Sequence, residues 1–152
     1  MTDKHKQPIS VLVLIHTAAL QVLLLERAAN PGYWQSVTGS REDTEALPTT
    51  ALRETREETG IDALASALRD WGLINRFEIF PQWRHRYAPG VSHNAERVFS
   101  LQLPAVAPIT VTPDEHARYV WLPWRDAADQ VFSWSNRDAI LMLPRIHGAI
   151  AD

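Results

Sequence analysis

The sequence predicts an α/β or α+β sandwich in which helices pack against a sheet of apolar strands. Two observations predict this class: β-branched, apolar runs recur along the chain, and two segments combine helical apolar spacing with capping residues. The chain has 152 residues, 45% of them hydrophobic and 22% charged, which are the size and composition of one ordinary folded domain. We therefore expect residues 1–152 to form a single domain.

The first part of the chain contains three strand-like segments. Residues 9–16 (ISVLVLIH) are apolar and rich in β-branched side chains, as in a buried strand. Residues 21–27 (QVLLLER) follow after a short polar gap, which predicts a hairpin partner. Residues 33–40 (YWQSVTGS) begin just after Pro31-Gly32 and predict a short strand or extended segment.

Two helices are predicted from start and stop signals. The first begins near Pro48, because proline is favoured in a first helical turn, and it ends at Gly60, where a C-terminal cap belongs. The second spans residues 133–146 (SWSNRDAILMLPRI), which carry serine caps and apolar helical spacing. Together with the strands, these helices complete the sandwich.

Three further strands are predicted in the second half of the chain. They are residues 72–80 (GLINRFEIF), residues 97–103 (RVFSLQL) and residues 117–122 (ARYVWL). An irregular segment, residues 81–96, separates the first two strands. A proline-rich connection, residues 104–116, leads to the third.

Charge and composition restrict the functional classes. The net charge of −3 gives no strong attraction to nucleic acid or to an anionic membrane, so we expect neither as a partner. The chain has no cysteine, which excludes disulfides, thiolate zinc sites and a cysteine nucleophile. The polar N-terminus and the short apolar run after it match neither a signal peptide nor a spanning helix. We expect a cytoplasmic monomer that binds a small molecule.

The predicted first helix carries an unusual concentration of carboxylates. Glu54, Glu57 and Glu58 have the i, i+3, i+4 spacing that places side chains on one face of a helix. Like charges at this spacing destabilise a bare helix, and Arg53 and Arg56 offset only part of the repulsion. Mg²⁺ prefers oxygen ligands and often bridges carboxylates to phosphates, so a metal site would explain the cluster.

A solvated surface helix is the simpler interpretation of the same carboxylates. Acidic residues at helical spacing are common on exposed faces, and a second face would then pack on the sheet. The residues predicted for that packing face are Ala51, Leu52 and Thr55. The cluster alone does not separate the two interpretations.

The wider spacing favours the metal site. Gly39 is followed after five residues by Glu45, then after seven by Arg53-Glu54, then by Glu57-Glu58 and Gly60. At ordinary residue usage, a chance match of these seven positions is on the order of one in a million. The pattern resembles the signature of the Nudix hydrolases. Thr55 departs from it, because an aliphatic residue is usual at that position.

The resemblance implies a fold, a reaction and a set of site residues. Nudix hydrolases have an α/β/α sandwich around a mixed β-sheet, and they hydrolyse a nucleoside diphosphate linked to another moiety with Mg²⁺ or Mn²⁺. By this resemblance Glu54, Glu57 and Glu58 would bind the metal and carry catalysis. Arg53 would orient a neighbouring acid, and Gly39 would permit the geometry between loop and helix.

Four segments outside this signature resemble a narrower branch of the family. They are residues 34–40, 77–80, 84–91 and 133–137, and they occur in the same order as in bacterial Nudix enzymes of folate biosynthesis. Those enzymes convert 7,8-dihydroneopterin 3′-triphosphate to the monophosphate and pyrophosphate.

This second resemblance implies further contact residues. Glu115 would add a metal ligand from outside the helix, and Trp34 and Trp134 would pack near the pterin ring. The residues implied to bind substrate are Lys6, Arg27, Thr38, Phe77, Glu78, Ile79, Phe80 and Ser133.

Simpler roles and other functions stay open at this point. Lys6 is equally compatible with a mobile terminal lysine, Arg27 with an ordinary ion pair, and Glu115 with an exposed acid in a turn. One alternative function is a broad-specificity enzyme that removes (d)NTPs or oxidised nucleotides. Another is a non-catalytic Nudix domain that senses a nucleotide, although such domains usually lose the glutamates that this chain keeps.

Overall fold

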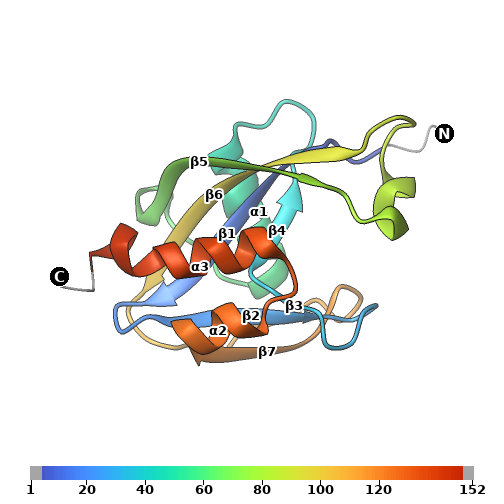
Figure 1. Cartoon of the computed structure of the whole chain (residues 1–152). Coiled ribbons are helices and arrows are strands. Elements are labelled where there is room, and N and C mark those ends of the chain that lie inside the picture. Colours follow the sequence, from blue (N-terminus) through green and yellow to red (C-terminus); the bar gives the residue numbers. More distant parts are fainter. Residues whose placement is uncertain (1–4, 149–152) are drawn as a thin grey trace.

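The computed structural model describes residues 5–148, in which seven strands form one mixed sheet with the order β3-β2-β1-β6-β5 (Figure 1). Strand β4 pairs with β1, and β7 pairs with β2. Among the paired strands of residues 5–148, β1 and β6 run parallel and the other pairs are antiparallel. The strands are β1 (Ile9–Thr17), β2 (Gln21–Arg27), β3 (Trp34–Gln35), β4 (Val37–Ser40), β5 (Leu68–Glu78), β6 (His93–Leu103) and β7 (His116–Pro123).

The sheet divides along one edge of β1. Near its end, β1 pairs with β2 at His16↔Val22, whereas its first half pairs with β4 from Ser10↔Ser40 to Val13↔Val37. Because β4 occupies this part of the edge, β1 and β2 diverge there. The N-terminal half of β1 therefore forms part of the wall of an opening between the two parts of the sheet.

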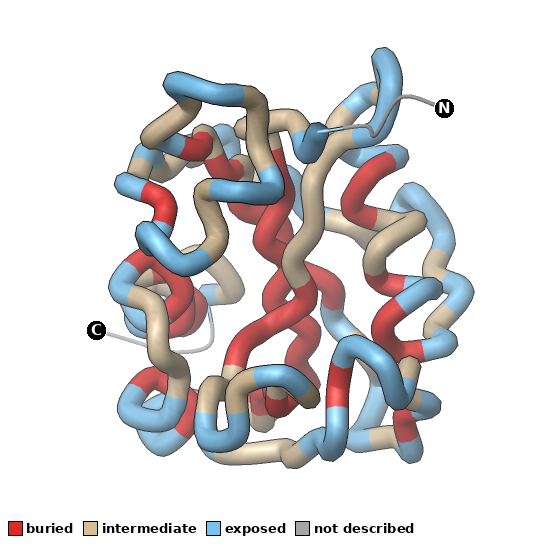
Figure 2. The backbone as a smooth tube through the Cα atoms, turned by 90° about the vertical axis from the view of Figure 1, so that its right-hand side faces the viewer, coloured by how far each residue is buried: buried red, intermediate tan, exposed pale blue. Residues whose placement is uncertain are grey.

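Helices cover both faces of the sheet, which confirms the α/β/α sandwich (Figure 1). Helix α1 (Leu47–Thr59) packs on one face, and α2 (Trp124–Gln130) and α3 (Trp134–His147) pack on the other. Buried segments run through the centre of the molecule and exposed segments surround them (Figure 2). No helix within residues 5–148 is long and apolar enough to cross a membrane.

Alternation along β1 builds two cores. Leu12 and Leu14 face α2 and α3, where they pack with Ile140. Val11 and Val13 point to the opposite face and pack in the same cluster as Ala51 of α1, as well as Ile15, Leu23, Leu25, Phe99 and Leu101. A β-strand buried on both faces needs apolar side chains throughout, which explains the unbroken run VLVLI.

Local sequence signals set the ends of α1. Proline lies in its first turn, and Gly60 caps its C-terminus with a left-handed φ of 76°, donating its N–H to the Arg56 carbonyl at 2.9 Å. Thr55, at the usually aliphatic position, is fully buried. Its hydroxyl oxygen has no hydrogen-bond partner in the described part of the chain. The helix was predicted correctly, and Thr55 is a weak point in its packing.

Two sequence-based predictions need correction, and one helix was missed. The strand predicted for residues 72–80 spans Leu68–Glu78, because a register shift between Asp70 and Ile74 lets pairing with β6 continue beyond Gly72. Within residues 81–96, expected to be irregular throughout, Pro81–Arg86 form a 3-10 helix, η2, and β6 begins at His93. Helix α2 was not predicted, since its seven residues are too few to show helical periodicity.

Candidate active site

A cavity of about 910 Å³ opens where β1 and β2 diverge. It is lined by residues from β1, β2 and β4, from α1, from the ends of β5 and β6, and from the start of α3. Most of the residues predicted to form the site line it: Lys6, Arg27, Thr38, Glu54, Glu58, Phe77, Glu78, Ile79, Phe80, Glu115 and Ser133. Among the described residues, Arg53, Glu57 and Trp34 are the predicted members that do not.

Glu54 and Glu58 form a carboxyl pair at one end of this cavity. Each of the two carboxyl groups shifts the pKa of the other, and the side chain of Glu58 is only 2% exposed. Burial raises the pKa of Glu54, and it raises the pKa of Glu58 well above its usual range. Oε1 of Glu58 has no hydrogen-bond partner within residues 5–148. The pair therefore presents hard carboxyl oxygens, at least one of which is free to bind a further group.

Glu57 points away from that pair. Its side chain is 51% exposed and accepts a hydrogen bond from Arg53 at 3.2 Å. Glu58 instead lies on the buried side of α1 with Ala51 and Thr55. Of the three glutamates expected on one face, only Glu54 and Glu58 therefore lie together. Helical spacing alone does not determine which side of a helix meets the sheet. The metal role of Glu57 stays a prediction.

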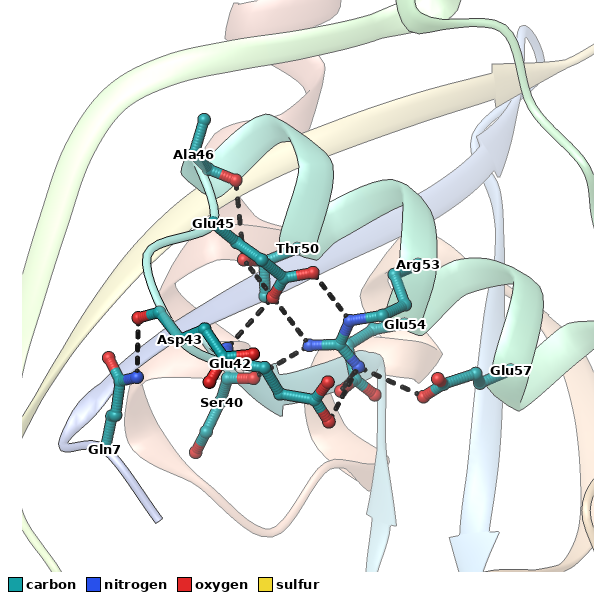
Figure 3. Close-up of polar contacts among 10 residues, drawn as sticks. All are labelled: Gln7, Ser40, Glu42, Asp43, Glu45, Ala46, Thr50, Arg53, Glu54 and Glu57. Carbon is teal, nitrogen blue, oxygen red and sulfur yellow. Dashed lines mark hydrogen bonds and ion pairs between the residues drawn. The ribbon is translucent and has the colours of Figure 1, made fainter.

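Arg53 connects the carboxylates of this region (Figure 3). Its Nε and Nη2 atoms donate to the two oxygens of Glu45 at 2.9 and 3.0 Å, and Nη1 donates to Glu54 at 2.8 Å. Nη2 also donates to the carbonyl oxygen of Ser40 at 3.1 Å, so the helix is tied to the end of β4. A guanidinium provides this planar set of donors, which lysine lacks. Arg53 thus orients Glu54 without lining the cavity.

Gly39 provides the space that Glu54 occupies. A Cβ atom at residue 39 would lie 2.1 Å from the Glu54 Cδ atom and 2.4 Å from its Oε1 atom. The backbone of Gly39 does not have a positive φ, so its glycine is required by this close approach rather than by a turn conformation.

Glu115, just before β7, and His116, the first residue of β7, lie at the same end of the cavity. The charge of Glu115 contributes to the raised pKa of Glu58. The His116 Nε2 atom lies 3.8 Å from Glu58 Oε1 and 3.4 Å from the side-chain nitrogen of Gln35. Burial, followed by the charge of Arg27, lowers the pKa of His116 to about 4, so the imidazole is neutral near pH 7.

The predicted substrate contacts surround the carboxyl pair. Arg27 donates to Asn30 Oδ1 at 3.1 Å, and its guanidinium lies 4.5 Å from the centre of the Trp83 ring. Lys6 is exposed and lies beside Tyr87, with which it forms an isolated bridge. These are two cationic side chains at a cavity that also holds carboxylates, an arrangement suited to a bound phosphate chain.

Two hydroxyl groups among the predicted contacts already have structural partners. The Thr38 hydroxyl donates to the carbonyl of Val11 at 2.9 Å. The Ser133 hydroxyl accepts the N–H of Asn136 at 3.2 Å and caps the N-terminus of α3. Both hydroxyl oxygens keep further hydrogen-bonding capacity toward the cavity. Substrate contact by these two residues stays a prediction.

Aromatic rings form another wall of the cavity. Phe80 stacks on Trp83 with ring centres 5.2 Å apart and planes at 2°, and Phe132 packs edge-on against both. Phe80 and Ile79 lie beyond the end of β5, which corrects the expectation that residues 77–80 are all part of a strand. Trp134 also lines the cavity, whereas Trp34 packs against the core beside α2 and α3.

Comparisons with known proteins agree with this geometry. Residues 6–143 match the model of the NUDIX domain. This chain belongs to the Nudix family. It is 47% identical over 144 residues to the dihydroneopterin triphosphate diphosphatase of Escherichia coli K12, covering 92% of this chain and 95% of that protein. The protein of the same name from Haemophilus influenzae Rd is 36% identical over 141 residues, covering 90% and 87%.

A solved structure supports the same assignment. The E. coli dihydroneopterin triphosphate pyrophosphohydrolase superposes on this Nudix domain with a TM-score of 0.84 and 47% identity, covering 90% of this chain and 94% of that one. The likeness covers most of this chain, so the cavity lies on a Nudix fold.

Nudix hydrolases generally use divalent metal ions. Within residues 5–148, no three His, Asp or Glu side chains are already arranged as one metal-binding group. The donor chemistry nevertheless fits a hard divalent cation, because Glu54 and Glu58 present buried carboxyl oxygens and one of them, Glu58 Oε1, lacks a partner. Glu57 would have to turn from Arg53 toward this pair to join it, whereas Glu115 already lines the same cavity.

Sequence reasoning missed several residues of this Nudix site. Gln35, Trp83, His116 and Phe132 line the cavity but were not predicted as members. His116 follows Glu115 directly, and the adjacency of two potential ligands was an available signal. Trp83 and Phe132 are almost fifty residues apart, and only the fold brings their rings together.

Proposed function

We propose that this Nudix domain hydrolyses 7,8-dihydroneopterin 3′-triphosphate to the monophosphate and pyrophosphate, with Mg²⁺ as its metal. The observation that carries the proposal is the continuity of the cavity: one space joins the Glu54–Glu58 pair to a wall of aromatic and buried polar side chains. A substrate with a triphosphate attached to a flat, polar heterocycle needs both: the carboxyl pair for its phosphates and the wall for its ring. The names of relatives with 47% and 36% identity support this substrate.

The reaction consumes one water molecule. The anhydride bond between the α- and β-phosphates breaks, the water oxygen ends on one of the two products, and the released protons leave with solvent or a base. A divalent cation, when bound, neutralises phosphate oxygens and lowers the pKa of water. Glu54, Glu58, Glu57 and Glu115 are the residues that we propose to hold it.

The remaining site residues position the substrate. Arg27 and Lys6 supply positive charge for the phosphate chain, and Arg53 keeps Glu54 oriented through its bonds to Glu45 and Ser40. The aromatic wall excludes water on one side of the cavity. These are roles in binding and orientation, and they leave the chemistry to the carboxylate end.

A panel of triphosphates tests the substrate. Purified protein with Mg²⁺ is given dihydroneopterin triphosphate, the four common dNTPs and 8-oxo-dGTP, and the release of pyrophosphate is measured for each. We expect kcat/KM for dihydroneopterin triphosphate to exceed that for any other member by at least about tenfold. A dNTP or 8-oxo-dGTP that is better by the same margin would establish the nucleotide-removal function instead.

The same assay distinguishes an enzyme from a sensor. Glu58→Gln is the matched control, since it keeps the side-chain shape while removing one carboxylate. A non-catalytic Nudix domain would bind triphosphate without releasing pyrophosphate. In that case the unmodified chain and Glu58→Gln would show the same absence of turnover.

A further inference from the structure

Two neighbouring polar side chains lie deep in the cavity and have no part in the roles above. Asn94 and Glu96 are two residues apart on β6, so they project to the same face of the sheet, on the side that α3 covers. Their exposed fractions are 4% and 5%, and both line the cavity. They thus form a polar floor of the cavity.

Each of these side chains has one hydrogen-bond acceptor without a partner. Asn94 donates through Nδ2 to the hydroxyl of Ser10 at 2.7 Å, and Glu96 is hydrogen-bonded to Ser135. The Asn94 Oδ1 atom and the Glu96 Oε1 atom have no partner among residues 5–148, although both are inaccessible. A buried acceptor left unpaired costs about 1–3 kcal/mol, so such atoms in a folded protein call for an explanation.

A nearby amide shows what a purely structural polar group looks like here. Asn136 also lines the cavity and is 1% exposed. Its Oδ1 atom accepts the N–H of Ser36 at 2.8 Å, and its Nδ2 atom donates to the Ser36 hydroxyl at 3.0 Å. Asn136 therefore ties α3 to the segment before β4. Asn94 and Glu96 keep unused acceptors and both line the cavity, so a molecule that enters it could supply the missing donors.

We propose that Glu96, assisted by Asn94, determines specificity for the heterocycle by accepting hydrogen bonds from a ring N–H and the adjacent exocyclic NH₂ of a 2-amino-4-oxopyrimidine ring. This inference rests on the proposed function, because it names the part of the substrate that this end of the cavity recognises. Pterins and guanine share that edge, whereas adenine and the pyrimidine bases lack it.

The chemistry of the two acceptors fits that edge. The ring N–H and the NH₂ group lie side by side and point the same way, so they match the two oxygens of a carboxylate, as a guanidinium does. Burial raises the pKa of Glu96 to about 7, and N–H donors from a bound ring would favour its charged form. A base that presented a carbonyl to Glu96 would leave buried acceptors facing each other.

Two nucleotides that differ only at this edge test the inference on the unmodified protein. GTP and ITP have the same ribose, triphosphate and ring N–H, but ITP lacks the NH₂ group. We expect kcat/KM to be about tenfold to a hundredfold higher for GTP, the range for loss of one hydrogen bond to a charged group. Equal values for GTP and ITP would overturn the inference without any variant having to fold.

Glu96→Gln then tests the residue itself. The amide keeps the shape but places a donor where the carboxylate accepts, so the GTP-to-ITP ratio should fall toward one, and kcat/KM for dihydroneopterin triphosphate should fall by at least about tenfold. Turnover of ITP, which keeps only the ring N–H, should fall by less than turnover of GTP. A circular dichroism melt verifies that the variant is folded.

The matched control is Glu26→Gln. Glu26 is a buried carboxylate, 6% exposed, that lies outside the cavity and is fully used by Arg118 and the N–H of Gly32. This variant should lose stability and keep the ranking of substrates. An equal loss on GTP and ITP in Glu96→Gln would mean that Glu96 only supports α3 through Ser135, and the inference would fail.

Failure of the inference and failure of the proposed function give different results. A strong GTP-to-ITP preference that depends on Glu96, combined with better turnover of a dNTP than of dihydroneopterin triphosphate, removes the pterin substrate but keeps the role of Glu96. In the reverse combination, the protein prefers the pterin substrate and Glu96→Gln does not change that preference. The proposed substrate would then stand, and Glu96 would have no role in recognising it.

Discussion

The carboxyl group of Glu54 lies where a side chain on Gly39 would begin: an added Cβ atom would be 2.1 Å from the Glu54 Cδ atom. Gly39→Ala should therefore displace Glu54 from the cavity, because the backbone of β4 cannot easily move away from β1. We expect kcat to fall by at least about tenfold, while the thermal melt shows a folded protein.

Gly72→Ala is the control for this substitution. Gly72 has a φ of +67° and open space around it, so alanine there strains the backbone without touching the site. It should cost about 1 kcal/mol of unfolding free energy and leave kcat unchanged. Full activity of Gly39→Ala would show that Glu54 can function from another position.

The different burial of Glu58 and Glu57 predicts different effects on turnover. Glu58→Gln removes a carboxylate from the buried pair and should lower kcat by at least about a hundredfold, the scale of losing metal-assisted stabilisation. Glu57→Gln alters a half-exposed side chain tied to Arg53 and should cost about tenfold. Steady-state kinetics at saturating Mg²⁺ measure both, and the reverse order would assign the main metal role to the exposed residue.

Removal of metal should abolish activity, and Glu115 should affect how much metal is needed. In excess EDTA we expect no hydrolysis, since the proposed ligands are hard oxygens that act only through a cation. Glu115→Ala should raise the Mg²⁺ concentration for half-maximal activity by about tenfold and leave the melting temperature in EDTA unchanged. An unaltered metal titration would make Glu115 an ordinary exposed acid.

The bidentate pair between Arg53 and Glu45 predicts a pH dependence of stability. Hydrogen bonds from Arg53 lower the pKa of Glu45 to about 2. The carboxylate therefore contributes stability that is fully present above its unfolded pKa, near 4.5, and that is lost as pH falls toward 2. The unfolding free energy of Glu45→Gln should be about 1–2 kcal/mol lower at pH 7. In urea titrations that difference should shrink below pH 4.5; a constant difference would contradict the pairing.

The unpaired hydroxyl of Thr55 predicts a stabilising substitution. Thr55→Val keeps the volume of the side chain and removes a buried oxygen that lacks a partner, so it should add about 1 kcal/mol to the unfolding free energy. Thr50 is equally buried on the same helix, but its hydroxyl donates to Glu45 at 3.1 Å. Thr50→Val should therefore destabilise, and the two opposite signs in urea unfolding test the assignment.

The sequence by itself determined the features that depend on near neighbours in the chain. Proline in the first turn and Gly60 at the end define α1, because both act through local backbone conformation. The apolar run of residues 9–16 defines a strand buried on both faces. The spacing from Gly39 to Gly60 identified the Nudix family, since that motif lies within the end of β4, one loop and one helix.

Only the tertiary structure decided which side chains act together. Spacing placed Glu54, Glu57 and Glu58 on one face, but the packing of α1 buries Glu58 and leaves Glu57 in solvent. The partners of Asn94 and Glu96 come from β1 and α3, more than thirty residues away in either direction. Burial and unpaired acceptors are properties of the folded chain, because they depend on contacts between distant segments that no local pattern encodes.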